Sequence, residues 1–267
     1  MFRTALNRCP NRCLSNPFGR DTSTSIVTGG LGRPLIVIVL LCGGVGTLPR
    51  LGTAGDPPTG AIADPLTATA KATAAAESDA GFVPLFDSRT LQGWEGKEVW
   101  FRIEEGAIVA GSLEKPIPHN QFLCTTRDFD NFELRMQVKT RGKGANGGIQ
   151  FRSRRVPDSD EVEGYQADVG GVSDRWVWGG LYDESRRRRF LAEPTAEQIE
   201  KLVRPDDWND YVIRCVGPRI ELFINGVRTV DYTESDPEIP RSGLIGLQIH
   251  SGPPCEVLYR NLRIRTL

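Results

Sequence analysis

The stretch that decides the fold class is IELFINGVRTVDY, residues 220–232. Its first half places Ile220, Leu222 and Ile224 at every second position, which is the period of a β-strand with one buried face. The dipeptide Asn225-Gly226 follows, and it favours a type I′ turn because both residues tolerate positive φ. Residues 227–232 then supply the return strand, so the stretch predicts an antiparallel hairpin.

The same alternation recurs on both sides of this hairpin, throughout residues 81–267. Only one helix is indicated, because Thr195 is a suitable N-cap with Gln198 at the third helical position, and the helix should end near Val203, before Pro205. We therefore predict one all-β domain, a two-sheet antiparallel jelly-roll sandwich with one short helix. Further strands are expected at residues 100–103, 132–138, 149–152, 208–216, 245–250 and 256–264.

Composition narrows the possible functions. The chain has 267 residues, of which 39% are hydrophobic and 25% are charged, so wholesale disorder and a collagen-like repeat are excluded. Lys and Arg number 33 against 34 Asp and Glu, and this balance argues against a nucleic-acid partner. With only two histidines, His119 and His250, one chain cannot form a three-histidine zinc site.

Residues 1–54 have the pattern of an export segment. Five arginines lie between Arg3 and Arg33, an apolar run extends from Leu35 to Leu48, and small residues follow. The run is shorter than the roughly 20 apolar residues of a membrane span, so we expect an exported protein, periplasmic or extracellular, with no stable transmembrane domain in its mature form. Cys42 suggests a lipoprotein anchor, but Leu41 precedes it where a small residue is expected, which favours simple export.

Residues 55–80 are rich in Ala, Thr and Pro, a composition that buries little and is typical of a linker. Three cysteines lie beyond it: Cys124, Cys215 and Cys255. An odd number leaves at least one thiol free, and export would permit one disulfide without requiring it.

Two tempting motifs fail on their context. Residues 142–147 fit G-x-G-x-x-G, but a predicted strand follows them, and a nucleotide phosphate needs a helix N-terminus there. The arginine run Arg186–Arg189 follows Asp183 and Glu184, which favours a solvated or acid-paired loop over a nucleic-acid site. The chain also lacks a G-x-S-x-G nucleophile elbow.

Polar side chains two residues apart recur on three predicted strands. The pairs are Gln150 with Arg152, Gln166 with Asp168, and Gln248 with His250, and each pair shares one face of its strand. Any single pair is best explained as the solvent side of an amphipathic strand. Three pairs of this composition together favour a ligand-binding face.

Several segments resemble the 3-keto-disaccharide hydrolase domain family, whose fold is a concanavalin A-like lectin/glucanase sandwich. The resemblance rests on an ordered series of short motifs across residues 81–267, each weak when taken alone. They are FVPLFDSRTLQGW at residues 82–94, NGGIQFR at 146–152, GYQAD at 164–168, WNDY at 208–211, ING at 224–226, GLQIH at 246–250 and YRNL at 259–262. The departures from the family pattern are Asp87, Gln166 and Asp168, all expected in the pocket.

The resemblance implies cleavage of 3-keto glycosides, with an oligosaccharide or 3-keto glycoside as the partner. The sugar's ketone acidifies the hydrogen at C2, a base removes it, the C1 glycosidic oxygen leaves and water adds. His250 and Asp168 are the candidate base or acid, and Arg152 is the candidate oxyanion stabiliser. A divalent cation held near Asp168 and His250 is an alternative electrophile. The candidate hydroxyl-binding residues are Asn146, Gln150, Gln166, Tyr182 and Gln248.

Two other classes of function stay open. A carbohydrate-binding module without catalysis would use a line of exposed aromatic side chains, which Trp176 and Trp178 would supply. A glycosidase with paired carboxylates would need two acids in one pocket. Its candidates Asp158, Asp160, Glu161 and Glu163 lie in a Pro-led acidic stretch that favours a loop. His119, which follows Pro118, is expected at the surface or at a pocket rim.

Overall fold

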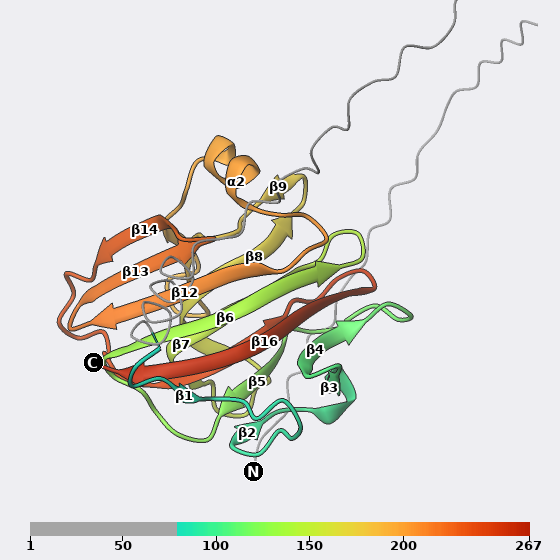
Figure 1. Ribbon diagram of the computed structural model, residues 1–267, viewed down its shortest axis with the longest axis horizontal. Helices are drawn as coiled ribbons and strands as arrows, with labels where there is room; N and C mark the ends of the chain where they lie inside the picture. Colours follow the sequence, from blue (N-terminus) through green and yellow to red (C-terminus); the bar gives the residue numbers. More distant parts are fainter. Residues whose placement is uncertain (1–78) are drawn as a thin grey trace, which may run out of the picture. The chain divides into compact units, whose positions relative to one another are not determined.

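Because apolar and polar residues alternate along the strands, each strand has one apolar face. The structure has two antiparallel sheets whose apolar faces pack together to form the core (Figure 1). The structure is a computed structural model and describes residues 79–267. Sheet A runs in the order β14-β13-β12-β6-β16-β4-β3, with β1 beside β16. Its strands are β1 (Val83–Pro84), β3 (Phe101–Glu104), β4 (Ala107–Ser112), β6 (Phe132–Arg141), β12 (Asn209–Val216), β13 (Arg219–Ile224), β14 (Val227–Thr233) and β16 (Cys255–Thr266).

Sheet B runs in the order β11-β10-β8-β7-β15-β5-β2, with β9 beside β8. A single 3₁₀ turn, η1 (Glu98–Trp100), precedes β3, and the α-helix α2 (Ala196–Leu202) joins β11 to β12. The predicted all-β two-sheet sandwich with one short helix is confirmed. The strands of sheet B are β2 (Trp94–Glu95), β5 (Gln121–Thr125), β7 (Asn146–Arg155), β8 (Val162–Val172), β9 (Arg175–Trp176), β10 (Leu181–Glu184), β11 (Phe190–Ala192) and β15 (Leu244–Ile249).

The two local signals read from the sequence form as predicted. Strands β13 and β14 make an antiparallel hairpin, and Asn225 and Gly226 have φ values of 49° and 83° at its turn. Thr195 caps α2: its hydroxyl accepts a hydrogen bond from the Gln198 amide, and the Gln198 side chain accepts one from the Thr195 amide. This reciprocal capping box sets where the helix begins.

Two core tyrosines of sheet A bond to the backbone of sheet B. The Tyr259 hydroxyl lies 2.8 Å from the Gln248 carbonyl oxygen and 3.1 Å from that of Gly148. The Tyr211 hydroxyl donates to the Asp168 carbonyl at 3.1 Å. Both tyrosines are buried, so these bonds fix the middle strands of sheet B against sheet A.

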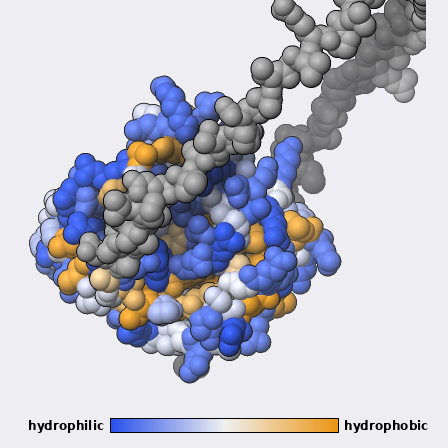
Figure 2. All heavy atoms as spheres, in the orientation of Figure 1, coloured by the Kyte–Doolittle hydropathy of each residue, from blue (hydrophilic) through white to orange (hydrophobic). Residues whose placement is uncertain are grey.

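The outer face of sheet A, turned away from sheet B, is held by ion pairs. Glu221 alone pairs with Arg214, Arg219 and Arg228, and the face of the molecule seen in Figure 2 is mostly hydrophilic. An open groove of about 830 Å³ crosses this side and is lined by Arg135, Val212 and Phe223 among others. Glu221 is buried, but its three arginine partners are 42–46% exposed, and solvent screening limits the stability that each pair contributes. This face carries none of the predicted site residues.

Some sequence-based expectations fall outside these residues. The export segment at residues 1–54 lies outside the described part of the chain, as does the linker at 55–80 except for its last two residues. Within residues 79–267, no helix is long and apolar enough to cross a membrane. Cys124, Cys215 and Cys255 are all buried free thiols.

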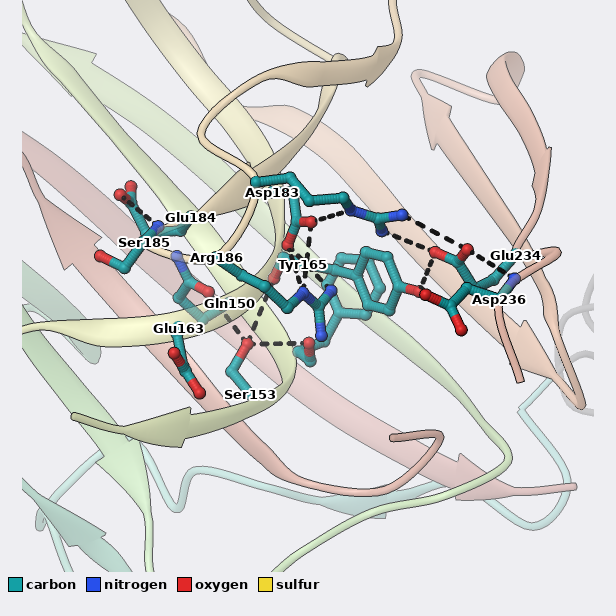
Figure 3. Close-up of polar contacts among 12 residues, drawn as sticks. Gln150, Ser153, Glu163, Tyr165, Asp183, Glu184, Ser185, Arg186, Glu234 and Asp236 are labelled. Atoms are coloured by element: carbon teal, nitrogen blue, oxygen red, sulfur yellow. Dashed lines mark hydrogen bonds and ion pairs between the residues drawn. The ribbon is translucent and has the colours of Figure 1, made fainter. Parts of the chain in front are cut away.

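A buried ionic cluster closes one end of the sandwich, where β10, β8 and the segment after β14 meet (Figure 3). Asp183 is wholly buried and accepts hydrogen bonds from Arg186 and Arg187. Arg187 also pairs with Glu234 at 2.6 Å, and Glu234 accepts a hydrogen bond from the Tyr165 hydroxyl at 2.7 Å. The arginine run is thus acid-paired through its first two members, as its context predicted.

Acid should weaken this cluster. Burial alone would raise the pKa of Glu234, but its hydrogen bonds from Arg187 and Tyr165 lower that pKa to about 2. A carboxyl with a lowered folded-state pKa stabilises the fold above its unfolded pKa, and this stability is lost as the pH falls toward 2. We expect Glu234→Gln to remove about 2 kcal/mol of pH-dependent stability over that range. Urea unfolding from pH 6 to pH 2 measures it, and parallel curves for the two proteins would contradict the assignment.

Candidate active site on the outer face of sheet B

Strand register brings most of the predicted polar residues onto the outer face of sheet B, which is the face turned away from sheet A. In one row across the strands, Gln150 faces Gln166, and Gln166 faces Tyr182. In the next row Gln248 faces Gly148, and Gly148 faces Asp168. Because residues opposite one another on neighbouring strands share a face, Gln150, Gln166, Asp168, Tyr182 and Gln248 form one group.

Direct hydrogen bonds link part of this group into a chain. The Ser153 hydroxyl lies 2.9 Å from Gln150 Oε1, Gln150 Nε2 donates to Gln166 Oε1 at 2.6 Å, and Gln166 Nε2 donates to Asp168 Oδ1 at 2.6 Å. Gln150 is fully buried, whereas Gln166 and Asp168 keep 4% of their surface exposed. The chain therefore starts beneath the face and ends at a carboxyl on it.

A second carboxyl, Glu184, lies on the same face and had not been predicted. Gln248 Nε2 donates to Glu184 Oε2 at 3.2 Å, and Gln248 itself is fully buried. Gln248 Oε1 has no hydrogen-bond partner among the described residues. Gln248 thus supports Glu184 much as Gln150 supports Gln166. Neither of these two glutamines has surface left with which to contact a sugar directly in this conformation.

The pKa of each carboxyl is raised. Burial raises the pKa of Asp168 well above its usual range, and the hydrogen bond from Gln166 offsets this only in part. Burial also raises the pKa of Glu184, while its hydrogen bond from Gln248 opposes the shift. The charge of Glu184 further raises the pKa of Asp168. Strongly shifted acids on one face are typical of sites that transfer protons.

Two of the predicted residues, His250 and Asn146, lie at the edge of this group. His250 directly follows β15 and is half-buried, and its backbone N–H donates to the Asn146 carbonyl at 3.0 Å. His250 Nδ1 lies 2.7 Å from the Ser251 carbonyl oxygen. A carbonyl can only accept, so Nδ1 carries the proton and Nε2 of the neutral ring keeps a free lone pair.

The prediction for Arg152 was wrong, because a β-bulge interrupts the alternation. Phe151 faces Tyr165 and Arg154 faces Glu163, so β7 advances by three residues while β8 advances by two. Arg152 takes a left-handed φ of 46° at this point, and one extra residue reverses the faces that follow it. Its buried guanidinium donates to the carbonyls of Asp130 and Gly217, at 2.9 and 2.7 Å, away from the outer face of sheet B.

The arginine that acts on Asp168 is Arg175 of β9, which sequence reasoning missed. Its charge lowers the pKa of Asp168, and its guanidinium lies 5.0 Å from the centre of the Phe190 ring. Phe190 packs edge-on against Tyr182, with ring centres 5.0 Å apart and an angle of 65° between the rings. Arg175 and Phe190 lie on strands of two and three residues, too short to show alternation. These aromatic residues form a wall beside the carboxyls.

Glycine residues leave space for the side chains of Gln166 and Gln150. A Cβ atom at Gly148 would lie 2.6 Å from the side-chain carbons of Gln166, and one at Gly246 would lie 3.2 Å from Gln150 Cβ. Any side chain at residue 148 would therefore displace Gln166 from its place between Gln150 and Asp168.

Other sequence-based candidates lie elsewhere or do not come together. Trp176 is 45% exposed but Trp178 only 2%, so the expected line of exposed aromatics is not formed. Asp87 is an exposed turn residue that accepts hydrogen bonds from Thr90, rather than a pocket residue. His119 is exposed, as expected.

The acidic stretch before β8 gives no carboxyl pair of its own. Asp160 pairs with Lys97 and Glu163 with Arg154, while Asp158 is exposed. Among residues 79–267, no three His, Cys, Asp or Glu side chains are grouped to hold a metal ion. The divalent cation therefore stays a prediction, and the described residues do not offer three such ligands for it.

Comparison with known proteins identifies the domain. Residues 81–265 match the family model described as a 3-keto-alpha-glucoside-1,2-lyase-like domain. No curated protein matches the chain. Among solved structures, two candidate glycosyl hydrolases from Parabacteroides distasonis are similar in fold. The first has 16% identity and a TM-score of 0.54, covering 72% of this chain and 96% of that one; the second has 20% identity and a TM-score of 0.51, covering 70% and 99%.

A Bacillus subtilis protein of unknown function with a galectin-like fold is also similar, at 10% identity and a TM-score of 0.50, with 69% of this chain and 94% of that one covered. At these identities the likeness concerns the fold alone, and it agrees with the two-sheet sandwich described above.

Proposed function

Because the chain belongs to the family of 3-keto-alpha-glucoside-1,2-lyase-like domains and its function therefore concerns carbohydrates, we propose that it cleaves 3-keto glycosides by elimination followed by hydration. The observation that carries this proposal is the group on the outer face of sheet B: a buried carboxyl with a raised pKa, Asp168, on the strand face that His250 borders. A site with one acid and one base suits a substrate that its own ketone has already activated.

The two residues take complementary roles in the proposed reaction. His250 Nε2 removes the proton at C2, and the electrons of that C–H bond form an enolate with C3. The enolate collapses to a C1=C2 double bond as the bond from C1 to the glycosidic oxygen breaks. Asp168, whose pKa is raised by burial, gives a proton to the leaving oxygen. Water then adds across C1=C2, with its hydroxyl at C1 and a proton at C2, so that the net change is hydrolysis.

Arg175 is proposed to stabilise the enolate oxygen, the role that the sequence had suggested for Arg152. Its side chain is 55% exposed and so can reach a ligand, and its charge already acts on Asp168. Tyr182, which is half-buried, and Gln166, which keeps 4% of its surface exposed beside Asp168, are proposed to bind sugar hydroxyls. The enzyme itself is proposed to be exported and to act in the periplasm or outside the cell, as the pattern of residues 1–54 predicts.

Arg175→Ala should lower kcat/KM on a 3-keto disaccharide by up to about 100-fold, because one donor to the developing oxyanion is lost. Arg175→Lys should recover only part of this, since a point charge does not reproduce the planar fork. The exposed Arg189→Ala is the matched control and should behave as the wild type. Equal activity of Arg175→Ala and Arg189→Ala would remove Arg175 from the site.

One observation favours a second candidate, a glycosidase with paired carboxylates. Asp168 and Glu184 lie on the same face with raised pKa values, and the charge of Glu184 acts on Asp168, as the two acids of such an enzyme would. The two functions differ in substrate. We expect turnover of a 3-keto disaccharide and none of its unoxidised parent, which lacks the acidified C2 hydrogen. Comparable rates on both sugars would favour the glycosidase, and sugar binding without turnover of either would favour a binding module.

A further inference from the structure

The hydrogen-bonded chain beneath Asp168 has one direction. Each side chain in it donates toward the carboxyl: Ser153 to Gln150, Gln150 to Gln166, and Gln166 to Asp168, over distances of 2.9, 2.6 and 2.6 Å. An amide presents a donor at one end and an acceptor at the other, so once its first partner is set, every later amide has only one orientation. The Asp168 end fixes this orientation, because Asp168 Oδ1 accepts from the Gln166 amide. The Ser153 hydroxyl supports the far end of the series, where Gln150 Oε1 and the Phe151 carbonyl oxygen both lie 2.9 Å from it.

We infer that Ser153 and Gln150 are positioning residues that act through Gln166 on Asp168. They hold the Gln166 amide with its N–H toward Asp168 Oδ1, which leaves Asp168 Oδ2 as the oxygen that carries and transfers the proton. This inference rests on the proposed function for its role in turnover, but not for the effect on Asp168 itself. It also differs from the role that the sequence suggested for Gln150, which was direct contact with the substrate.

The bulge in β7 builds this arrangement. The extra residue that turns Arg152 away places Ser153 on the outer-face side of β7, where its hydroxyl reaches Gln150. The position opposite must be glycine: a Cβ atom at Gly164 would lie 2.2 Å from Ser153 Oγ, and Gly164 has a φ of 144°. Ser153 is itself only 2% exposed. A hydroxyl buried this deeply, with a space kept open for it, is typical of a built contact rather than of an incidental surface residue.

None of the three side chains that lead to Asp168 is charged: they are Ser153, Gln150 and Gln166. The charged groups that act on Asp168 come from other elements: Glu184 of β10, Glu193 after β11 and Arg175 of β9. Tyr182 of β10 also faces it, since the charge of Asp168 raises the pKa of Tyr182. Ser153 contacts none of these four groups: its hydroxyl meets Gln150 Oε1 and the carbonyl oxygens of Phe151 and Tyr165. The side-chain route from Ser153 to Asp168 therefore runs through Gln150 and Gln166.

The test is a titration of the Asp168 carboxyl by carbon-detected NMR on the full-length chain, with the signal assigned from the Asp168→Asn spectrum. The hydrogen bond from Gln166 lowers the pKa of Asp168, so freeing the amide should raise that pKa. We expect a rise in Ser153→Ala and a larger one in Gln150→Leu. The exposed Ser242→Ala is the matched control and should titrate as the wild type.

Turnover supplies the second readout. On a 3-keto disaccharide, kcat should fall by about 10-fold or more in Ser153→Ala, up to the roughly 100-fold cost of a misplaced group, with KM nearly unchanged and the Asp168 limb of the pH profile moved upward. If Ser153→Ala does not fold, Gln150→Leu gives the same test. An Asp168 titration unchanged in both variants would overturn the inference. If the wild type turns over no 3-keto sugar, the proposed function fails, but the titration still decides the positioning role.

Discussion

Asp168→Asn lowers kcat on a 3-keto glycoside by about 10² to 10⁴-fold, the usual contribution of a positioned proton donor. Asn has the same shape and keeps an oxygen that can accept the hydrogen bond now made by Gln166 Nε2 to Asp168 Oδ1. Substrate binding should therefore change much less than turnover, because the lost proton transfer belongs to the transition state. Steady-state kinetics that separate kcat from KM measure this.

The same variant should be at least as stable as the wild type near neutral pH. A buried carboxyl with a raised folded-state pKa stabilises the fold only at low pH, and this contribution disappears as the pH rises through that pKa. Asn carries no charge to bury, so it avoids the cost. The exposed Asp174→Asn serves as the control and should change neither activity nor stability. A large loss of stability in Asp168→Asn would show that Asp168 is a structural group rather than a proton donor.

Arg152→Met is expected to lower stability and leave turnover unchanged, the reverse of Asp168→Asn. It removes the hydrogen bonds that the buried guanidinium now makes to the carbonyls of Asp130 and Gly217, and a hydrogen bond to a charged group contributes about 1.5–3 kcal/mol. We expect the free energy of unfolding to fall by about 3 kcal/mol, with kcat per folded molecule close to that of the wild type. Urea unfolding and activity corrected for the folded fraction measure the two quantities.

A neighbouring residue provides the control for Arg152→Met. The side chain of Arg154 is 75% exposed and pairs with Glu163, so Arg154→Met removes the same charge with little cost. If Arg152→Met instead retained its stability and lost turnover, Arg152 would act as the oxyanion stabiliser that the strict alternation of its strand had suggested.

The parts of the fold that depend on local chemistry were predictable from the sequence. Asn225-Gly226 specifies a hairpin because few other dipeptides tolerate its φ values, and Thr195 with Gln198 specifies a helix start because each caps the other. Gln166 and Asp168 share a face because nothing interrupts the alternation between them. Their meeting with Gln150 depends on strand pairing, which the pattern of one strand does not encode.

The rest of the site depends on contacts that act across the chain. Arg152 leaves the face because of one extra residue in β7, and a bulge changes the pairing without changing the sequence pattern. The sequence did not point to Glu184 because the alternation of its strand, β10, is interrupted. Asp183 places a charge at a buried position, where an apolar residue would be expected. That charge is tolerated because Arg186 and Arg187 pair with it. Arg175 reaches Asp168 only through the pairing of β9 with β8.

The proposed elimination leaves an isotopic mark that no glycosidase with paired carboxylates produces. We would incubate a 3-keto disaccharide with the full-length protein in D₂O and examine the released 3-keto sugar by mass spectrometry and NMR. The same sugar in D₂O without protein, and with His250→Ala, would report the spontaneous exchange at C2. Elimination followed by hydration predicts one deuterium at C2 of every product molecule, well above that background. Product that keeps its original hydrogen at C2 would contradict the mechanism and assign the bond cleavage to direct displacement at C1.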